Sequence, residues 1–175
     1  GVGKSTLIKL LLSLISPEEG KIFIYDNEKT TEASAASRCN LVYVPQGNSL
    51  FSGTIRENLL MGKPQASEQE LRQALYTAAA DFVWNLRKGL DTPCFEKGGG
   101  LSEGQAQRIA IARGLLRKGS ILLMDEFSSA LDIETEALLI KRLSEQMSGK
   151  TMIFITHREM ITQHCDKILK LKKEA

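Results

Sequence analysis

The sequence predicts an α/β fold with a mainly parallel sheet, and three observations support this. Short apolar segments at 41–44, 121–124 and 151–155 alternate with helical patterns, the order that builds parallel sheets. An Asp-Glu pair follows the second of these segments directly, at the end of the strand where α/β proteins place ligands. A Gly-Lys-Ser run precedes the first predicted helix, as in loops that bind phosphate.

Hydrophobic spacing and breaker residues give each element its bounds. Leucines and isoleucines between residues 7 and 15 recur at helical spacing, and Pro17 with Gly20 ends that helix. In chain order we then expect a strand at 21–25, a loop to about 37, a strand at 41–44, helices at 54–61, 67–80, 81–86 and 102–116, a strand at 121–124, a helix at 133–147, a strand at 151–155, a short helix and a last strand at 167–171.

The run of helices between the first two buried strands predicts an insertion in the α/β core. We therefore divide the single domain, residues 1–175, into a core of 1–50 and 119–175 and a helical subdomain of 51–118.

Composition excludes several classes of protein. The net charge of +2 gives no sign of general nucleic-acid affinity, so no nucleic acid is expected as a partner. Cys39, Cys94 and Cys165 are widely spaced, which argues against a disulfide framework or a zinc site. Because no apolar run approaches the ~18 residues of a spanning helix, any membrane contact must come from other segments or subunits.

The first residues predict a phosphate-binding loop. Gly3-Lys4-Ser5 is the second half of the pattern G-x-x-x-x-G-K-[ST], and the surrounding stretch from Gly1 to Thr6 would present backbone N–H groups to phosphate oxygens. Lys4 should reach the β- and γ-phosphates, and the Ser5 hydroxyl should bind Mg²⁺. A chance Gly-Lys-Ser at a helix start is the alternative for this fragment alone.

The pattern lacks its first glycine and the strand that feeds the loop, so we expect the domain to be truncated at its front. The α-amino group of Gly1 then adds a titratable charge beside the phosphates. For these reasons the 175-residue chain alone is expected to bind ATP weakly, to expose apolar surface and to be marginally stable.

Asp125 and Glu126 follow the apolar strand at 121–124. Asp125 is placed to hold Mg²⁺ through water, opposite Ser5, while Glu126, one residue further, could polarise an attacking water. A surface Asp-Glu at a strand end is the alternative, and the phosphate loop in the same chain makes it the weaker one.

A second anion site is predicted at the helix that begins near residue 102. Ser102 and Gln105 form a capping box, with Leu101 at the hydrophobic staple position. Gly104 lowers helix propensity in the first turn, which is unexpected unless something packs closely there. The exposed N-terminus of a helix binds anions, although a simply capped helix explains the local pattern equally well.

Five motifs in order resemble those of ABC ATPases. Residues 101–105 resemble the signature motif, and the continuation 107–113, Gln-Arg-Ile-Ala-Ile-Ala-Arg, matches closely. Residues 129–132 resemble the D-loop, Gln46 the Q-loop glutamine and His157 the switch histidine. Asp125-Glu126 (Walker B) is the fifth of these motifs, and with the phosphate loop (Walker A) the resemblance covers essentially the whole chain.

The resemblance implies a P-loop NTPase (RecA-like) core, with its first strands missing here, that binds ATP and Mg²⁺. In this family two domains pair head to tail, so Ser102 and Gly104, with Gln105, would contact the γ-phosphate held by Lys4 of the partner subunit. Gln46 would contact Mg²⁺ and the attacking water, and His157 would bridge that water and the γ-phosphate. Asp132 would cross the dimer interface. ATP binding would close the dimer and hydrolysis would open it.

Residues 48–59 and Glu96 resemble exporter-type members. The resemblance then implies a transmembrane domain fused upstream, a second ATP-binding domain as partner and a place at the cytoplasmic face of a membrane. Three residues depart from the family pattern: Phe95 and Glu103 stand where glycine is usual, and Phe127 where a small residue or proline is usual.

Three other functions share part of this pattern. A soluble ABC ATPase acting on ribosomes or DNA has the same catalytic motifs, but residues 51–59 argue against it. A module that retains ATP without hydrolysing it conflicts with the presence of Glu126 and His157. A P-loop kinase has no need of the segment 101–105.

Overall fold

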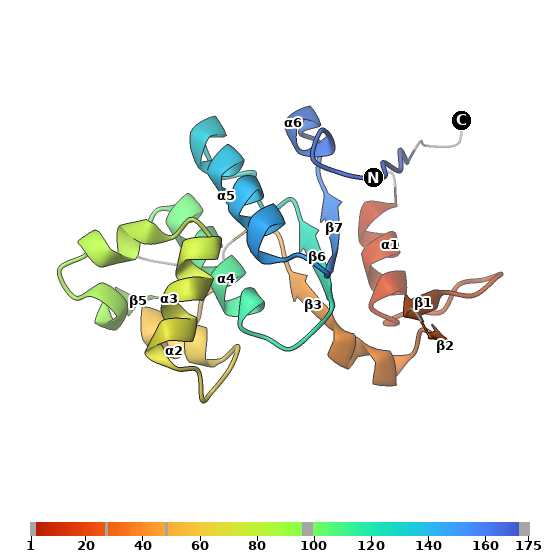
Figure 1. Ribbon diagram of the computed structural model, residues 1–175, viewed down its shortest axis with the longest axis horizontal. Helices are drawn as coiled ribbons and strands as arrows, with labels where there is room; N and C mark the ends of the chain where they lie inside the picture. Colours follow the sequence, from red (N-terminus) through yellow and green to blue (C-terminus); the bar gives the residue numbers. More distant parts are fainter. Residues whose placement is uncertain (1–2, 27, 48, 96–99, 172–175) are drawn as a thin grey trace.

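The computed structural model describes residues 3–26, 28–47, 49–95 and 100–171. At its centre lies a three-stranded parallel sheet, with β6 (Ile121–Asp125) between β3 (Leu41–Val44) and β7 (Thr151–Ile155) (Figure 1). The register pairs Val44 with Met124 and Asp125 with Ile155, so the carboxyl ends of all three strands meet at one edge. The predicted parallel core is thereby confirmed.

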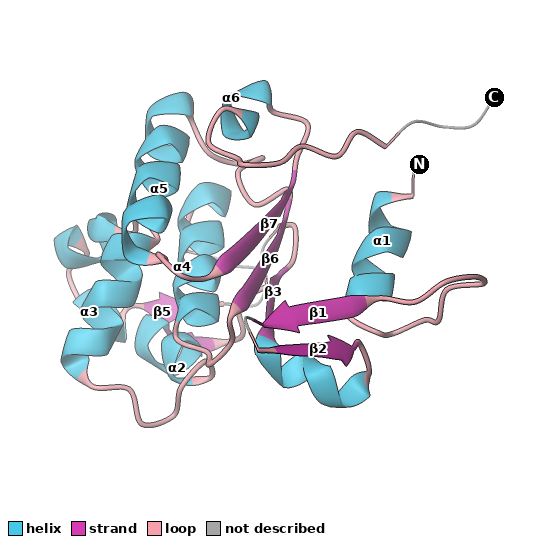
Figure 2. Ribbon diagram, turned by 45° about the vertical axis from the view of Figure 1, so that its right-hand side comes forward, coloured by secondary structure: helices cyan, strands magenta, loops and turns pink. Residues whose placement is uncertain are grey.

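Helices cover both faces of this sheet. Figures 1 and 2 place α1 (Lys4–Leu11) on one side and α4 (Glu103–Leu115) and α5 (Ile133–Gln146) on the other. On the α1 face, Ile8 packs against Leu123 of β6 and Ile155 of β7. The opposite face carries the larger apolar core, which includes Val42, Met124 and Ile109. Burial on both faces explains why these strands are continuously apolar.

The segment between β3 and β6 contains α2 (Ile55–Leu60), α3 (Glu68–Thr77) and α4. Both α2 and α3 pack against α4, and α3 also contacts α5. Short elements connect them: β4 (Gly53–Thr54), which pairs with β5 (Pro93–Cys94), and the 3₁₀ helices Asp81–Asn85 and Gly89–Asp91. A short helix, α6 (Glu159–Thr162), follows β7.

Two predicted strands differ from the structure. The strand expected at 21–25 is β1 (Phe23–Asp26), and it pairs antiparallel with β2 (Lys29–Glu32), in a stretch expected to be a loop. A further 3₁₀ helix, Ala35–Asn40, occupies the end of that loop. The last strand, expected at 167–171, was a wrong prediction, because those residues form no strand and the side chains of Ile168 and Leu169 are exposed.

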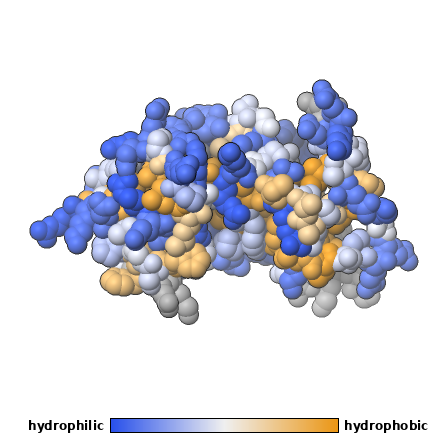
Figure 3. Space-filling model, turned by 90° about the horizontal axis from the view of Figure 1, so that it is seen from below, coloured by the Kyte–Doolittle hydropathy of each residue, from blue (hydrophilic) through white to orange (hydrophobic). Residues whose placement is uncertain are grey.

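Apolar side chains reach the surface around α1 and the β1–β2 hairpin. Leu14 is 56% exposed and Tyr25 is 75% exposed, and the side chains of Ile15 and Phe23 are also exposed. Figure 3 shows apolar surface on this half of the molecule. Apolar surface is thus exposed as expected, while the marginal stability of the isolated chain stays a prediction.

Among the described residues no helix is long and apolar enough to cross a membrane. Cys39, Cys94 and Cys165 are all free thiols, as their spacing predicted.

Candidate functional site

Three predicted site residues from distant parts of the chain meet at the carboxyl edge of the sheet. Lys4 begins α1, Glu126 follows β6 and His157 follows β7. The Lys4 ammonium contacts both the Glu126 carboxylate and Nε2 of His157, and that Nε2 lies 3.2 Å from Oε1 of Glu126. A cation, a carboxylate and an imidazole are thus grouped in one partly exposed cluster.

The backbone fixes the position of Glu126. Its φ of 41° lies in the left-handed region, which is uncommon for a residue with a side chain. The amide of Glu126 donates to the carbonyl of Ile155 at 2.8 Å, and the amide of Ser129 donates to the carbonyl of Glu126 at 3.1 Å. These two bonds turn the chain sharply out of β6, so that the carboxylate is aimed at Lys4.

Electrostatics distinguish the two adjacent carboxylates. The hydrogen bond from Lys4 holds the pKa of Glu126 below its usual range. Burial, followed by the charge of Glu126, raises the pKa of Asp125. The Tyr43 hydroxyl, which the sequence did not single out, donates to Oδ2 of Asp125 at 3.5 Å. Asp125 therefore lies in a more enclosed setting, with Tyr43 orienting it from β3.

The start of α1 suits a phosphate group. Gly3 caps the helix with a φ of 87°, and among the described residues no side chain makes a hydrogen bond at this cap. A Cβ at Gly3 would meet nothing within 4 Å, which leaves space beside the first N–H groups of α1. Ser5 and Thr6 follow in the exposed first turn. Helix N-termini of this kind bind phosphate.

A magnesium ion also fits the residues present. No group of three or more His, Cys, Asp or Glu side chains in the described part of the chain forms a metal cage. Mg²⁺ in nucleotide sites uses one or two protein oxygens together with phosphates and water, so Ser5 and Asp125 are an adequate donor set. Gln46, two residues beyond β3, is exposed, and Nε2 of Gln107 in α4 donates to the preceding carbonyl of Pro45 at 3.3 Å.

The second predicted phosphate-binding site is the N-terminus of α4, in another part of the chain. Ser102 caps α4 as expected: its hydroxyl accepts from the amide of Gln105 at 3.2 Å, and its amide donates to the Gln105 side chain at 3.0 Å. The helix lies on the opposite side of the sheet from α1 (Figures 1 and 2). The structure therefore does not join the two predicted phosphate-binding helix tips on one face.

Gly104 is required by close packing within the chain. A Cβ at this position would lie 2.7 Å from the carbonyl oxygen of Ala130 and 3.2 Å from a methyl of Leu131. The helix tip thus rests directly on the segment 129–131, which explains the glycine that its helix propensity disfavours.

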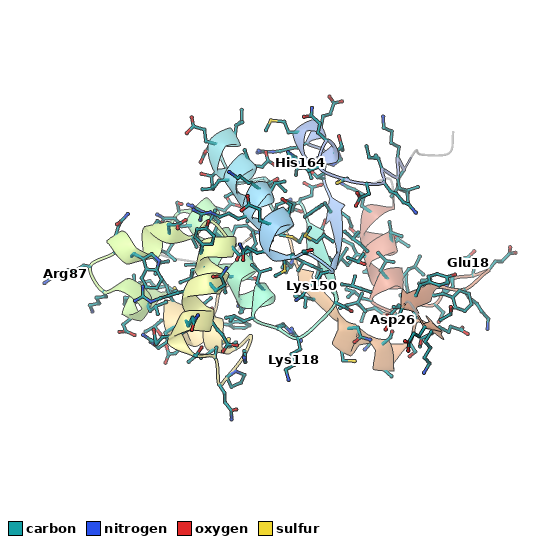
Figure 4. All side chains as sticks on the ribbon, in the orientation of Figure 1. Glu18, Asp26, Arg87, Lys118, Lys150 and His164 are labelled. Carbon is teal, nitrogen blue, oxygen red and sulfur yellow. The ribbon has the colours of Figure 1, made fainter. Side chains whose placement is uncertain are left out.

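Asp132 caps α5 within its own chain. Its two carboxylate oxygens accept from the amide and the hydroxyl of Thr135, each at 2.8 Å, and the backbone hydrogen bond lowers the pKa of Asp132. His164, for which no role was predicted, lies exposed just beyond α6 (Figure 4).

Packing accounts for one of the three residues that depart from the family pattern. Phe127 is fully buried, and its ring centroid lies 5.3 Å from that of Phe154 in β7. Glu103 and Phe95 are exposed. Gly1 and Glu96 lie outside the described residues.

Sequence reasoning missed Arg158, which directly follows His157. Its guanidinium donates to Glu136 and to the carbonyls of Ser129 and Leu131. An arginine after a strand is too common for the sequence to signal these contacts.

Comparisons with known proteins agree with this geometry. Residues 1–129 match the family model described as ABC transporter. A putative export ATP-binding/permease protein of Rickettsia felis is 42% identical over 174 residues, which are 99% of this chain and 30% of that protein. The probable multidrug resistance ABC transporter ATP-binding/permease protein YheI of Bacillus subtilis is 42% identical over 97% of this chain and 29% of its own length.

A solved structure of a bacterial Atm1-family ABC exporter with ATP bound is similar to this chain, with a TM-score of 0.82 and 39% identity over 91% of this chain and 28% of the other. The predicted P-loop NTPase fold is therefore confirmed. The chain spans about 30% of the length of the curated relatives it matches. With its central parallel sheet, its Lys4–Glu126–His157 cluster and these matches, the chain belongs to the ABC transporter family.

Proposed function

We propose that this chain is an ATP-binding and ATP-hydrolysing domain of an ABC exporter, working with Mg²⁺. The observation that carries the proposal is the meeting of Lys4, Glu126 and His157 at the carboxyl edge of the sheet. A lysine at a glycine-capped helix start serves phosphate, and a carboxylate beside an imidazole serves proton transfer. These groups together suit hydrolysis of a phosphoanhydride.

Each residue has a role in this proposal. Triphosphate gives Lys4 a more strongly charged partner than Glu126, so Lys4 moves to the β- and γ-phosphates and releases the carboxylate. Glu126 then orients the attacking water and accepts a proton from it. His157 donates to the γ-phosphate, and Gly1, Gly3 and Thr6 contribute backbone or hydroxyl groups around the phosphates.

Ser5, Gln46 and Asp125 are the residues proposed to hold Mg²⁺. The ion neutralises charge on the β- and γ-phosphate oxygens when bound. Tyr43 keeps Asp125 in place for this task.

A complete site needs a second copy of the domain, in our proposal. The chain's own α4 tip lies across the sheet from α1, so Ser102, Gly104 and Gln105 serve nucleotide held by another domain. Two opposed helix N-termini then enclose the γ-phosphate in the closed, head-to-tail dimer. Asp132 lies at the same interface. ATP drives closure because these contacts to the γ-phosphate exist only in the closed state.

The second proposed partner is a transmembrane domain. In this proposal the ATP-binding domain lies at the cytoplasmic face of the membrane that this partner spans. The relatives above are named ATP-binding/permease proteins, which supports a membrane domain in the same polypeptide, upstream of this one. In this proposal the helical subdomain of residues 51–118 transmits closure to that domain, and the core of 1–50 and 119–175 holds nucleotide.

Replacing Glu126 by Gln in the complete transporter tests the proposed function. Loss of the proton acceptor should lower steady-state ATP hydrolysis by about 100-fold or more. Nucleotide binding should persist, because Gln keeps the size of the side chain, and the variant should retain ATP in a closed dimer. Glu134→Gln, at an exposed position of α5, is the control and should hydrolyse ATP at the normal rate. Unchanged hydrolysis in Glu126→Gln would contradict the proposal.

A further inference from the structure

Arg158 clamps the segment that precedes α5. Its Nη1 donates to Oε2 of Glu136 at 2.8 Å and to the carbonyl of Leu131 at 3.2 Å. Its Nη2 donates to the carbonyl of Leu131 at 3.2 Å and to that of Ser129 at 3.3 Å. One guanidinium therefore joins the residue after His157 to the backbone of 129–131 and to α5.

The partner carboxylate is deeply buried. The side chain of Glu136 is 3% exposed, and its other oxygen, Oε1, has no hydrogen-bond partner among the described residues. Arg158 supplies the charge that compensates this carboxylate. A buried pair of this kind costs desolvation, and such pairs are kept in some proteins because they fix a single geometry.

The clamped segment carries the tip of α4. The carbonyl of Ala130, which lies between the two carbonyls held by Arg158, is the atom that a Cβ at Gly104 would approach to 2.7 Å. Ser102 stands two residues before Gly104 at the same helix tip. Rigid contacts therefore run from Arg158 through residues 129–131 to the α4 tip.

From these contacts we propose that Arg158 is a positioning residue for the neighbouring nucleotide site. By holding residues 129–131, Arg158 fixes the position of the N-terminus of α4. In the proposed dimer, that helix end contacts the nucleotide bound by the other copy. Arg158 directly follows His157, which is proposed to contact the γ-phosphate at its own site. Loss of that γ-phosphate can therefore shift Arg158 and, through residues 129–131, the α4 tip that contacts nucleotide at the other site. The inference rests on the proposed head-to-tail site.

A mixed dimer separates this role from a local one. One copy carries Glu126→Gln, so the nucleotide bound by its own Lys4 is not hydrolysed. All turnover then comes from the other site. That site is formed by Lys4, Glu126 and His157 of the unchanged copy and by the α4 tip of the altered copy. Arg158→Lys is then added to the altered copy. Lysine keeps the charge but not the fork that bridges Glu136 and two carbonyls. We expect ATP turnover by this dimer to fall about tenfold, the range of typical coupling between sites.

Three comparisons make the result decisive. Arg56→Lys in the altered copy, where the arginine pairs with Glu68 and Asp91, should leave turnover unchanged. The double variant Arg158→Met, Glu136→Leu removes the clamp without leaving a buried charge, and it should show the same loss as Arg158→Lys even if the single variant folds poorly. Arg158→Lys in the unchanged copy instead measures any effect of Arg158 on the active site of its own copy, through the neighbouring His157.

Full turnover with the double variant in the altered copy, or a loss confined to the unchanged copy, would overturn the inference. Ser102→Phe in the altered copy should abolish turnover. Full turnover with that variant would overturn the head-to-tail site itself, which distinguishes the two failures.

Discussion

At the scale of single residues, close contact explains choices that propensity disfavours. Gly104 weakens the first turn of α4, yet only a residue without a side chain allows the helix tip to touch the carbonyl of Ala130. The sequence showed that this glycine was unexpected, but the atom that requires it lies 26 positions away and only the fold reveals it.

Gly104→Ala should therefore destabilise the complete ATP-binding domain. The added methyl would overlap backbone that Arg158 holds in place, and overpacking of this kind costs about 1–3 kcal/mol. The measurement is the free energy of unfolding in urea. Glu103→Ala, at the neighbouring exposed position, is the control and should change that energy by less than about 0.5 kcal/mol. Equal stability of the two variants would show that the tip does not rest on Ala130.

Short patterns led to the candidate site residues. Lys4, Asp125 and Glu126 stood out because a glycine loop and an acidic pair after an apolar strand occur together in one chain, although each pattern alone has a common alternative explanation. The left-handed backbone at Glu126 and the contacts of Tyr43 and Arg158 were not predictable, since each depends on partners distant in sequence.

At the scale of elements, local capping patterns explain where three of the helices begin. The pattern of a hydroxyl residue followed three positions later by Glu or Gln occurs before α2, α3 and α4, and each instance forms a capping box in the structure. Both partners lie within one turn, so the sequence alone contains the information.

Two of these caps form a matched pair for experiment. Ser67→Ala at α3 and Ser102→Ala at α4 each remove one cap hydrogen bond, and each should lower the free energy of unfolding by about 1 kcal/mol. Only Ser102→Ala should also lower ATP turnover by the complete transporter, because only the α4 tip is proposed to contact phosphate. Equal turnover in the two variants would reduce Ser102 to a structural cap.

Helix ends and edge strands were less predictable. The helix expected to reach Ile15 ends at Leu11, because Ser13 adopts a φ of 51° and the amides of Ser13 and Leu14 close a Schellman motif. Ala79 ends α3 in the same way. Glycine usually marks this position, so neither stop was visible. All four residues of β2 are exposed, which removes the alternation that identifies a strand.

At the scale of the whole molecule, the two groups of residues that we propose to form one nucleotide site with a second copy lie on different sides of the sheet. The Lys4 cluster lies at the carboxyl edge of the sheet beside α1, and the Ser102 tip belongs to a helix on the other side. The order of motifs led us to predict both groups, and the parallel sheet explains how distant segments assemble the first, while a phosphate-binding role of the α4 tip stays a prediction.

The most direct test of the shared site places two defects in different combinations on two copies of the transporter. Lys4→Ala removes one phosphate ligand, and Ser102→Phe blocks one α4 tip. With the defects on separate copies, a head-to-tail dimer keeps one intact site and should occlude one ATP per dimer. With both defects on the same copy it should occlude none. The reverse result, one ATP with both defects on the same copy and none with them apart, would show that each chain uses its own α4 tip and would contradict the proposed site.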